Sequence, residues 1–123
     1  MEKRDRPRVV IAGAGFGGLA AARTLAHSPV DVWIVDRNNY HTFPPLLYQV
    51  AAGELEPGDI AYPIRTILRK IPNAQFSLGD IRGVDLEKRV LEIDGRSVPY
   101  DYLILATGTV DHFFGVSGAA EYA

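Results

Sequence analysis

Gly13-Ala14-Gly15-Phe16-Gly17-Gly18 is the stretch that decides the fold of this chain. A β-branched run, residues 8–12, precedes it, and an alanine-rich run, residues 19–26, follows it. This order predicts a strand, a tight turn and a helix. The apolar run at 30–35 predicts a second strand, which ends at Asp36. A strand, a crossover helix and a second strand form the βαβ unit of a parallel sheet.

The glycine spacing in this stretch is typical of a turn that binds a dinucleotide. Gly13, Gly15 and Gly18 form a G-x-G-x-x-G pattern between the predicted strand and helix. The first glycine permits the tight turn, the second lets a pyrophosphate approach the backbone, and the third lets the helix pack closely on the strand. The free N–H groups and the positive end of the helix would then bind the phosphates.

An acidic residue at the end of the second strand supports this interpretation. Asp36 lies eighteen residues after Gly18, where a carboxylate can accept hydrogen bonds from the hydroxyls of an adenosine ribose. The same carboxylate would repel a 2′-phosphate, which disfavours NADP. Arg37 keeps NADP open as an alternative, because an arginine can pair with that phosphate. FAD and NAD share their ADP half, so the motif alone does not choose between them.

The rest of the chain predicts loops, short helices and a small antiparallel meander. Short helices are expected at 46–51 and 60–70, within a segment interrupted by prolines. Strands are expected at 75–78, 81–85, 89–93 and 96–98, with a hairpin turn at Asp94-Gly95, and a last strand, buried on both faces, at 102–106. The predicted class is therefore α/β: a Rossmann-like, three-layer fold with a parallel sheet and a β-meander.

Composition excludes several classes of function. The chain has 123 residues, a formal net charge of −2 and a pI of about 5.9, so no basic field favours nucleic acid. Cysteine is absent, which removes disulfides, thiolate zinc sites and redox-active cysteine pairs from this stretch. No apolar run is long enough to span a membrane. The basic residues 1–7 are expected to form a flexible lead-in.

The layout after Asp36 resembles that of flavoproteins with two dinucleotide sites, in which FAD binds first and NAD(P)H second. Within that class, the chain is similar to the type II NADH dehydrogenases, which are single-subunit NADH:quinone oxidoreductases. This resemblance favours FAD on the first turn. Pro44 departs from the glutamine expected there, which affects a side-chain contact and not the fold. The most specific similarity lies in residues 9–19, 36–43, 45–51, 60–65 and 100–108.

The resemblance implies a set of cofactor-binding residues. The pyrophosphate is expected on the glycine turn, the adenine beside Arg37 and the backbone of Ile81, and the flavin half beside residues 42–46. The turn after the last strand is expected to approach the cofactor. No residue is expected to act as a nucleophile or metal ligand, because the flavin carries the redox chemistry. The implied residues are Gly13, Gly15, Phe16, Gly17, Gly18, Asp36, Arg37, Thr42, Ile81, Ala106, Thr107 and Gly108.

The resemblance also implies an activity, hydride transfer from NADH to FAD and delivery of electrons to a quinone. Residues 8–110 would form the first segment of the FAD-binding domain, and residues 111–123 would begin a linker to an NADH-binding domain. The family's second glycine motif, quinone motif and membrane-anchoring helices are absent from these residues, so the chain alone is expected to lack turnover. The complete protein is expected to be cytoplasmic, peripheral on the cytoplasmic face of the membrane.

The absence of the family's later motifs from these residues leaves two alternative functions open and predicts self-association. The chain could be a stand-alone dinucleotide-binding module, or the first part of a sulfide:quinone reductase, whose essential cysteines would lie after residue 123. A disulfide reductase is disfavoured, because its cysteine pair would fall near residues 45–52, which contain none. The incomplete domain would leave one edge of the strand at 102–106 unpaired, so we expect self-association to a homo-oligomer.

Several conspicuous side chains have structural interpretations. His41 is expected to be a hydrogen-bonding loop residue, and Asp59 is expected to be a helix N-cap. The paired rings of Phe113-Phe114 are expected at the edge of the domain, exposed in this chain. Packing roles are expected for the aromatic residues Tyr40, Phe43 and Tyr48.

Overall fold

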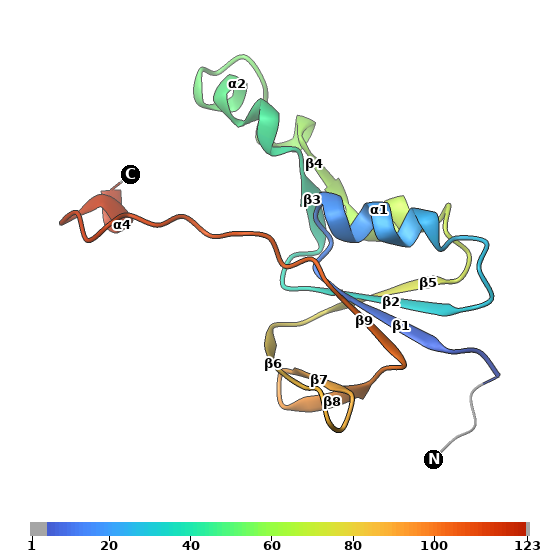
Figure 1. Ribbon diagram of the computed structural model, residues 1–123. Coiled ribbons are helices and arrows are strands. Elements are labelled where there is room, and N and C mark those ends of the chain that lie inside the picture. Colours follow the sequence, from blue (N-terminus) through green and yellow to red (C-terminus); the bar gives the residue numbers. More distant parts are fainter. Residues whose placement is uncertain (1–4, 123) are drawn as a thin grey trace.

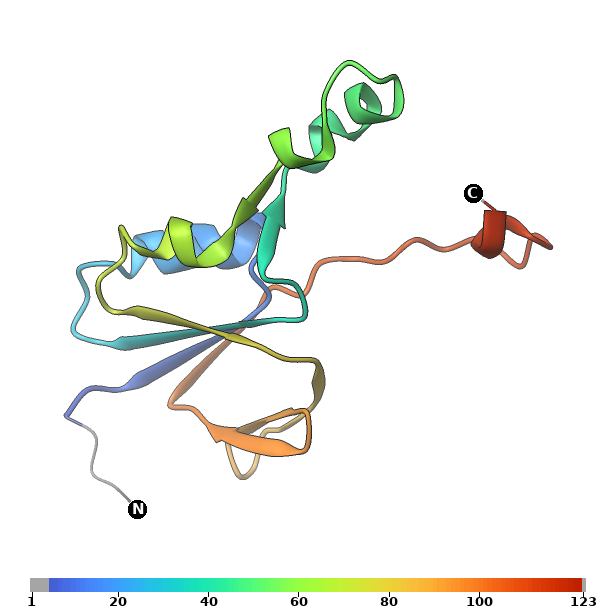
Figure 2. The ribbon, with the colours of Figure 1, turned by 180° about the vertical axis from the view of Figure 1, so that it is seen from behind.

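The computed structural model describes residues 5–122. Helices cover one face of a parallel sheet and an antiparallel meander covers the other (Figure 1, Figure 2). This arrangement confirms the predicted three-layer α/β class. The strands are β1 (Arg8–Ala12), β2 (Asp31–Asp36), β3 (Tyr40–Thr42), β4 (Ala61–Pro63), β5 (Ala74–Leu78), β6 (Ile81–Asp85), β7 (Val90–Ile93), β8 (Arg96–Pro99) and β9 (Tyr102–Leu105). The helices are α1 (Phe16–Thr24), α2 (Leu47–Ala51), α3 (Ile64–Leu68) and α4 (Ala119–Tyr122), with 3-10 turns η1 (Pro44–Leu46) and η2 (Pro57–Asp59).

The central sheet is parallel and has the strand order β5-β2-β1-β9. Ile11 of β1 pairs with Ile34 of β2 on one side and with Ile104 of β9 on the other. The predicted βαβ unit is confirmed, because α1 connects the neighbouring strands β1 and β2. The prediction that the last strand is buried on both faces is wrong. Tyr102 and Leu105 are 63% and 66% exposed, because β9 is an edge strand with a paired neighbour on one side only.

Side chains along β1 alternate between two hydrophobic clusters. Ile11 packs toward α1 and α3, in a cluster that we call the helix-side core, together with Ile64. Val10 packs toward the meander β6-β7-β8, in a cluster that we call the meander-side core, together with Leu91 and Ile93. The sheet therefore separates two cores that share its strands.

Helix α1 lies close on the sheet because Gly18 has no side chain. A Cβ at Gly18 would collide with the carbonyl oxygen of Gly13. Ala22, one turn further along the same helix face, is fully buried. Gly18 therefore has the role that the glycine pattern predicted, which is to let the helix pack closely on the strand.

The segment between β2 and β5 contains a hairpin that the sequence analysis did not predict. Strands β3 and β4 pair in antiparallel register, with His41 opposite Tyr62. The residues between these strands form a lobe that projects from the body (Figure 1). The helix expected at 46–51 is confirmed as α2. The helix expected at 60–70 is shorter, because Pro63 disfavours helical geometry at the preceding residue and α3 begins only after it.

The chain leaves the body after β9. Residues 106–118 contain no helix or strand and run away from the sheet to the short helix α4 (Figure 1). Phe114 is 84% exposed, as expected for a ring at the edge of a domain. Of the expected lead-in, residues 5–7 have no helix or strand, and residues 1–4 lie outside the described chain, as does residue 123. The domain boundaries at 8–110 and 111–123 stay predictions.

Candidate functional site

The turn after β1 brings three strand ends together. The N–H of Gly13 donates to the carbonyl of Val35 at 2.7 Å, and Gly13 has a φ of +107°, in the region that favours glycine. A Cβ at this position would collide with the carbonyl of Ala106. Gly13 is therefore required both by its backbone conformation and by the close approach of the chain that follows β9.

The start of α1 offers a row of unpaired backbone donors. The helix begins after Gly15 without a side-chain cap, and its first internal acceptor, the carbonyl of Gly15, bonds to Leu19. In the described part of the chain, the N–H groups of residues 15–18 have no acceptor. A Cβ at Gly15 would meet nothing within 4 Å. Open space above free N–H groups at a helix N-terminus fits the pyrophosphate of a dinucleotide.

Asp36 lies where β2 ends and supports the turn from that side. Its Oδ2 accepts a hydrogen bond from the N–H of Ala14 at 2.7 Å, and its Oδ1 accepts one from the N–H of Asn38 at 2.8 Å. An ionised carboxylate has about four acceptor positions, so both oxygens retain capacity for ribose hydroxyls. The hydrogen bond from Ala14 to Asp36 is a structural contact that the sequence did not predict. The remaining acceptor capacity of Asp36 agrees with the predicted role toward a ribose.

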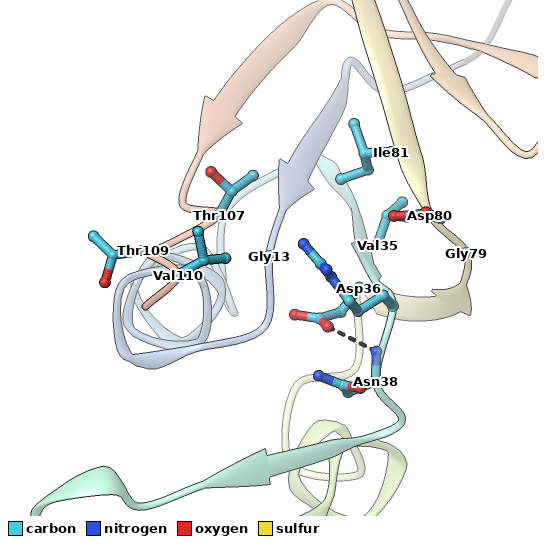
Figure 3. A pocket seen from close by; sticks show the side chains of 11 residues that line it. Gly13, Val35, Asp36, Asn38, Gly79, Asp80, Ile81, Thr107, Thr109 and Val110 are labelled. Atoms are coloured by element: carbon cyan, nitrogen blue, oxygen red, sulfur yellow. Dashed lines mark hydrogen bonds between the residues drawn. The ribbon is translucent and has the colours of Figure 1, made fainter. Parts of the chain in front are cut away.

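A cavity of about 520 Å³ opens beside Asp36. Figure 3 shows Asp36 in the middle of this cavity, with Thr107 and Val110 on one side and Ile81 on the other. Because these strands are parallel, the cavity lies at the carboxyl ends of β1, β2 and β5, where ligands of open α/β sheets bind. It is lined by Gly13, Val35, Asp36, Arg37, Asn38, Gly79, Asp80, Ile81, Thr107, Thr109 and Val110.

Some of the predicted cofactor-binding residues line the cavity, and others lie outside its lining. The start of α1 adjoins it through the turn, and Thr42 lies apart, half-buried on β3. The sequence analysis missed the lining residues next to strand ends, although the carboxyl ends of the predicted strands already pointed to Gly79 and Asp80. The predicted residues that line the cavity are Gly13, Asp36, Arg37, Ile81 and Thr107, and those that do not are Gly15, Phe16, Gly17, Gly18, Thr42, Ala106 and Gly108.

An aromatic cluster lies on the other side of the turn. The ring of Phe16 makes edge contacts with His41 at 5.0 Å and with Phe43 at 5.5 Å, measured between ring centroids. Nδ1 of His41 lies 3.3 Å from the carbonyl oxygen of Ala14, which confirms His41 as a hydrogen-bonding residue. The expected loop position is wrong, because His41 lies in strand β3. Tyr40 and Tyr48 are exposed, so the prediction that they pack is wrong. Their backbone lies on β3 and on the projecting lobe, away from both cores.

Two further expectations concern the lobe. Asp59 accepts a hydrogen bond from the N–H of Glu56 at 2.9 Å, but it does so from the third position of η2, with Glu56 as the N-cap. The prediction that Asp59 is the N-cap of the helix expected at 60–70 is therefore wrong, because α3 begins at Ile64 with Pro63 at its N-cap. Pro44 starts the 3-10 turn η1, where its missing N–H leaves no donor unpaired. No group of side chains in residues 5–122 has the composition and arrangement of a metal site.

Within residues 5–122, no helix is both long enough and apolar enough to cross a membrane.

Comparison with known proteins gives one family and several relatives. The family model described as pyridine nucleotide-disulphide oxidoreductase matches residues 7–123. A type II NADH:quinone oxidoreductase of Mycobacterium tuberculosis is 46% identical over 122 residues, which cover 96% of this chain and 26% of that protein. A second such protein from the same organism is 43% identical over the same shares. The chain thus spans about a quarter of the length of these relatives.

Solved structures agree with this grouping. NDH2 from Plasmodium falciparum, in a complex with NADH, superposes with a TM-score of 0.84 at 26% identity, over 96% of this chain and 25% of that one. The sulfide:quinone oxidoreductase of Aquifex aeolicus superposes with a TM-score of 0.83 at 29% identity, over 94% of this chain and 27% of that one. The sheet, the helices and the meander described above are therefore an arrangement that these proteins share.

Proposed function

Because the chain belongs to the pyridine nucleotide-disulphide oxidoreductase family, we propose that it is the FAD-binding part of an NADH dehydrogenase that passes a hydride from NADH through FAD to a quinone. The similarity to type II NADH:quinone oxidoreductases supports the activity. The observation that carries a dinucleotide ligand is the open turn beside Asp36, where unpaired N–H groups for a pyrophosphate adjoin a carboxylate for ribose hydroxyls. The family similarity supports FAD as that dinucleotide.

The residues of this chain would bind and orient the cofactor. The N–H groups of residues 15–18 would hold the pyrophosphate, and Asp36 would accept hydrogen bonds from the adenosine ribose. Arg37 and Ile81 would lie beside the adenine, and the segment 106–108 would approach from the end of β9. Thr42 would lie toward the flavin half. When bound, the flavin supplies hydride acceptance and onward electron transfer, and the protein supplies placement and electrostatics.

Titration calorimetry with four ligands tests this proposal. ADP, NAD and FAD should all bind, since each presents an ADP moiety, and FAD should bind best if the segment after Asp36 contacts the flavin half. NADP should bind more weakly, because its 2′-phosphate meets the Asp36 carboxylate. Tighter binding of NADP than of FAD would contradict the assignment, as would the absence of binding by all four.

A sulfide:quinone reductase is the second candidate, and the superposition on the Aquifex aeolicus enzyme favours it. Both candidates predict the same FAD site in this chain. A stand-alone module without turnover is the third. Assays of the complete protein with NADH and with sulfide as electron donors separate the first two. For the chain alone we expect no NADH–quinone turnover, and rates of roughly 1 per second or more would overturn that expectation.

We also propose that the chain associates with itself through the free edge of β9. Among residues 5–122, this strand pairs with β1 alone, and its side chains Tyr102 and Leu105 are exposed. An unpaired apolar edge is a template for another strand. Analytical ultracentrifugation should show a dimer or larger species, and Leu105→Lys should shift the protein toward monomer. A monomeric wild-type chain at tens of micromolar would contradict the proposal.

For the complete protein we propose a cytoplasmic location, peripheral on the cytoplasmic face of the membrane. The named activity of the relatives supports this, because NADH is dissolved in the cytoplasm and quinones with apolar tails reside in the bilayer. Cell fractionation should find the protein with membranes and release it without detergent. Recovery only after detergent solubilisation would contradict a peripheral location.

A further inference from the structure

Ala14, between the first two glycines of the turn, is held on both sides by side chains. Its N–H donates to Oδ2 of Asp36 at 2.7 Å, and its carbonyl oxygen lies 3.3 Å from Nδ1 of His41. Within residues 5–122, these are the side-chain hydrogen bonds that the backbone of the turn receives. They fix two consecutive peptide planes, Gly13–Ala14 through Asp36 and Ala14–Gly15 through His41.

The orientation of the second plane decides where the N–H of Gly15 points. In a planar trans peptide, the carbonyl of one residue and the N–H of the next point in opposite directions. A hydrogen bond that holds the Ala14 carbonyl toward β3 therefore turns the Gly15 N–H away from β3. This N–H has no acceptor in the described chain, and the space above Gly15 is open.

His41 is itself well placed to act as this support. Strand β3 is fixed by its pairing with β4, in which His41 lies opposite Tyr62. The imidazole is half-buried and stands edge-on to the ring of Phe16, with 5.0 Å between centroids. A carbonyl oxygen can only accept, so the contact with Ala14 requires the proton on Nδ1. The ring is thus held from two directions, by its strand and by the first residue of α1.

We infer that His41 is a positioning residue for the dinucleotide: its Nδ1–H holds the Ala14 carbonyl and thereby aims the N–H of Gly15 at the pyrophosphate. The inference rests on the proposed function, since it assigns a dinucleotide to the turn. It goes beyond the glycine pattern, because it makes the geometry of the turn depend on a side chain from a separate hairpin. A role in packing alone would depend on the ring and not on the donor.

Two substitutions separate the donor from the ring. His41→Phe keeps a ring against Phe16 and removes the donor, whereas His41→Asn removes the ring and keeps an N–H on the atom bonded to Cγ, where Nδ1 lies in histidine. FAD affinity should fall about 3- to 10-fold in His41→Phe, the range for one lost hydrogen bond. It should be largely restored in His41→Asn. His27→Phe is the matched control, because His27 is exposed beyond the far end of α1, and its affinity should equal that of the wild type.

A second measurement works without any ligand. NMR order parameters of the Ala14 and Gly15 amides should fall in His41→Phe and stay near the rigid-backbone value of about 0.85 in His41→Asn. Equal FAD affinity and equal order parameters in all variants would overturn the inference, and so would equal losses in both His41 variants, which indicate packing alone. If the wild type binds no FAD, the proposed function fails by itself, and the order parameters still decide the role of His41 in shaping the turn.

Discussion

The two faces of the central sheet are filled in different ways. On the helix side, contact depends on the absence of side chains, since Gly18 and Ala22 bring the backbone of α1 down onto the strands. On the meander side, contact depends on large side chains, and Leu91, Ile93 and Tyr100 fill the space between the sheet and the meander. Both cores bury large aliphatic side chains, but on the helix side the backbone of α1 also lies close on the strands.

The difference follows from where the turn lies. The start of α1 has to bring free N–H groups to the strand ends, and a side chain at Gly18 would collide with the carbonyl oxygen of Gly13 and lift the helix away. The meander reaches the cavity only at its first residues, around Ile81. Meander residues further along the chain, such as Leu91 and Ile93, can therefore fill the core with large side chains. A substitution at Gly18 should therefore affect both folding and ligand binding, whereas one at a meander residue that does not line the cavity, such as Leu91, should affect folding alone.

The largest expected effect is the loss of volume in the meander-side core. Leu91 is fully buried, and Leu91→Ala should lower the free energy of unfolding by about 3 kcal/mol through lost burial and a residual cavity. Chemical denaturation measures this loss. Leu86→Ala is the control on the same meander, where Leu86 is 75% exposed and the change should stay within about 0.5 kcal/mol. A large loss of FAD affinity by folded Leu91→Ala would break the comparison.

The next effect is the insertion of a methyl group into the helix-side core. Gly18→Ala would press a Cβ against the carbonyl of Gly13, and we expect a cost of about 2–3 kcal/mol in the free energy of unfolding. Gly17→Ala is the matched control one residue away, because its Cβ would lie at an ordinary 3.6 Å from the Cβ of Ala106. That variant should lose nothing and can gain up to about 1 kcal/mol from helix propensity. Equal stability of the two variants would show that α1 does not lie as close as described.

The helix side was also the better predicted region. Its pattern is local, since each glycine has its own steric reason and a strand, a turn and a helix follow one another within twenty residues. The fold class, the βαβ unit, the meander and the site residues Gly13 and Asp36 could be predicted from local sequence patterns. The family resemblance supplied Ile81 and Thr107, which no local pattern marks.

The poorly predicted features depend on contacts between distant residues. Strand β3 is three residues long and exists because it pairs with β4, about twenty residues later. The contact of Asp36 with Ala14 and that of His41 with the same residue arise only when three separate segments meet. The exposure of β9 depends on which segments cover the edge of the sheet. An apolar run in the sequence does not indicate whether such a segment is present.

The third effect is smaller and concerns binding. Asp36→Ala removes the acceptor of the Ala14 N–H and of the ribose hydroxyls, so FAD affinity should fall by about 2 kcal/mol, or roughly 30-fold. Asp85→Ala is the matched control, because Asp85 caps the turn between β6 and β7 with a hydrogen bond from the N–H of Lys88 at 2.9 Å, on the meander side. Calorimetry should find its FAD affinity unchanged. Equal affinity of Asp36→Ala and the wild type would reduce Asp36 to a structural residue of the turn.

The smallest effect is the pH dependence of that meander turn. Hydrogen bonding from the Lys88 backbone N–H, together with the Lys88 ammonium at 3.3 Å, holds the pKa of Asp85 below its ordinary value of 3.8. A depressed pKa in the folded state means that the contribution of Asp85 to stability is present above pH 3.8 and is lost as the pH falls through the folded value. NMR titration of the Asp85 carboxyl carbon should give a midpoint below 3.8. The difference in unfolding free energy between the wild type and Asp85→Asn should shrink as the pH falls below 3.8. A titration midpoint of Asp85 at or above its ordinary value would contradict a pH-dependent contribution of this turn.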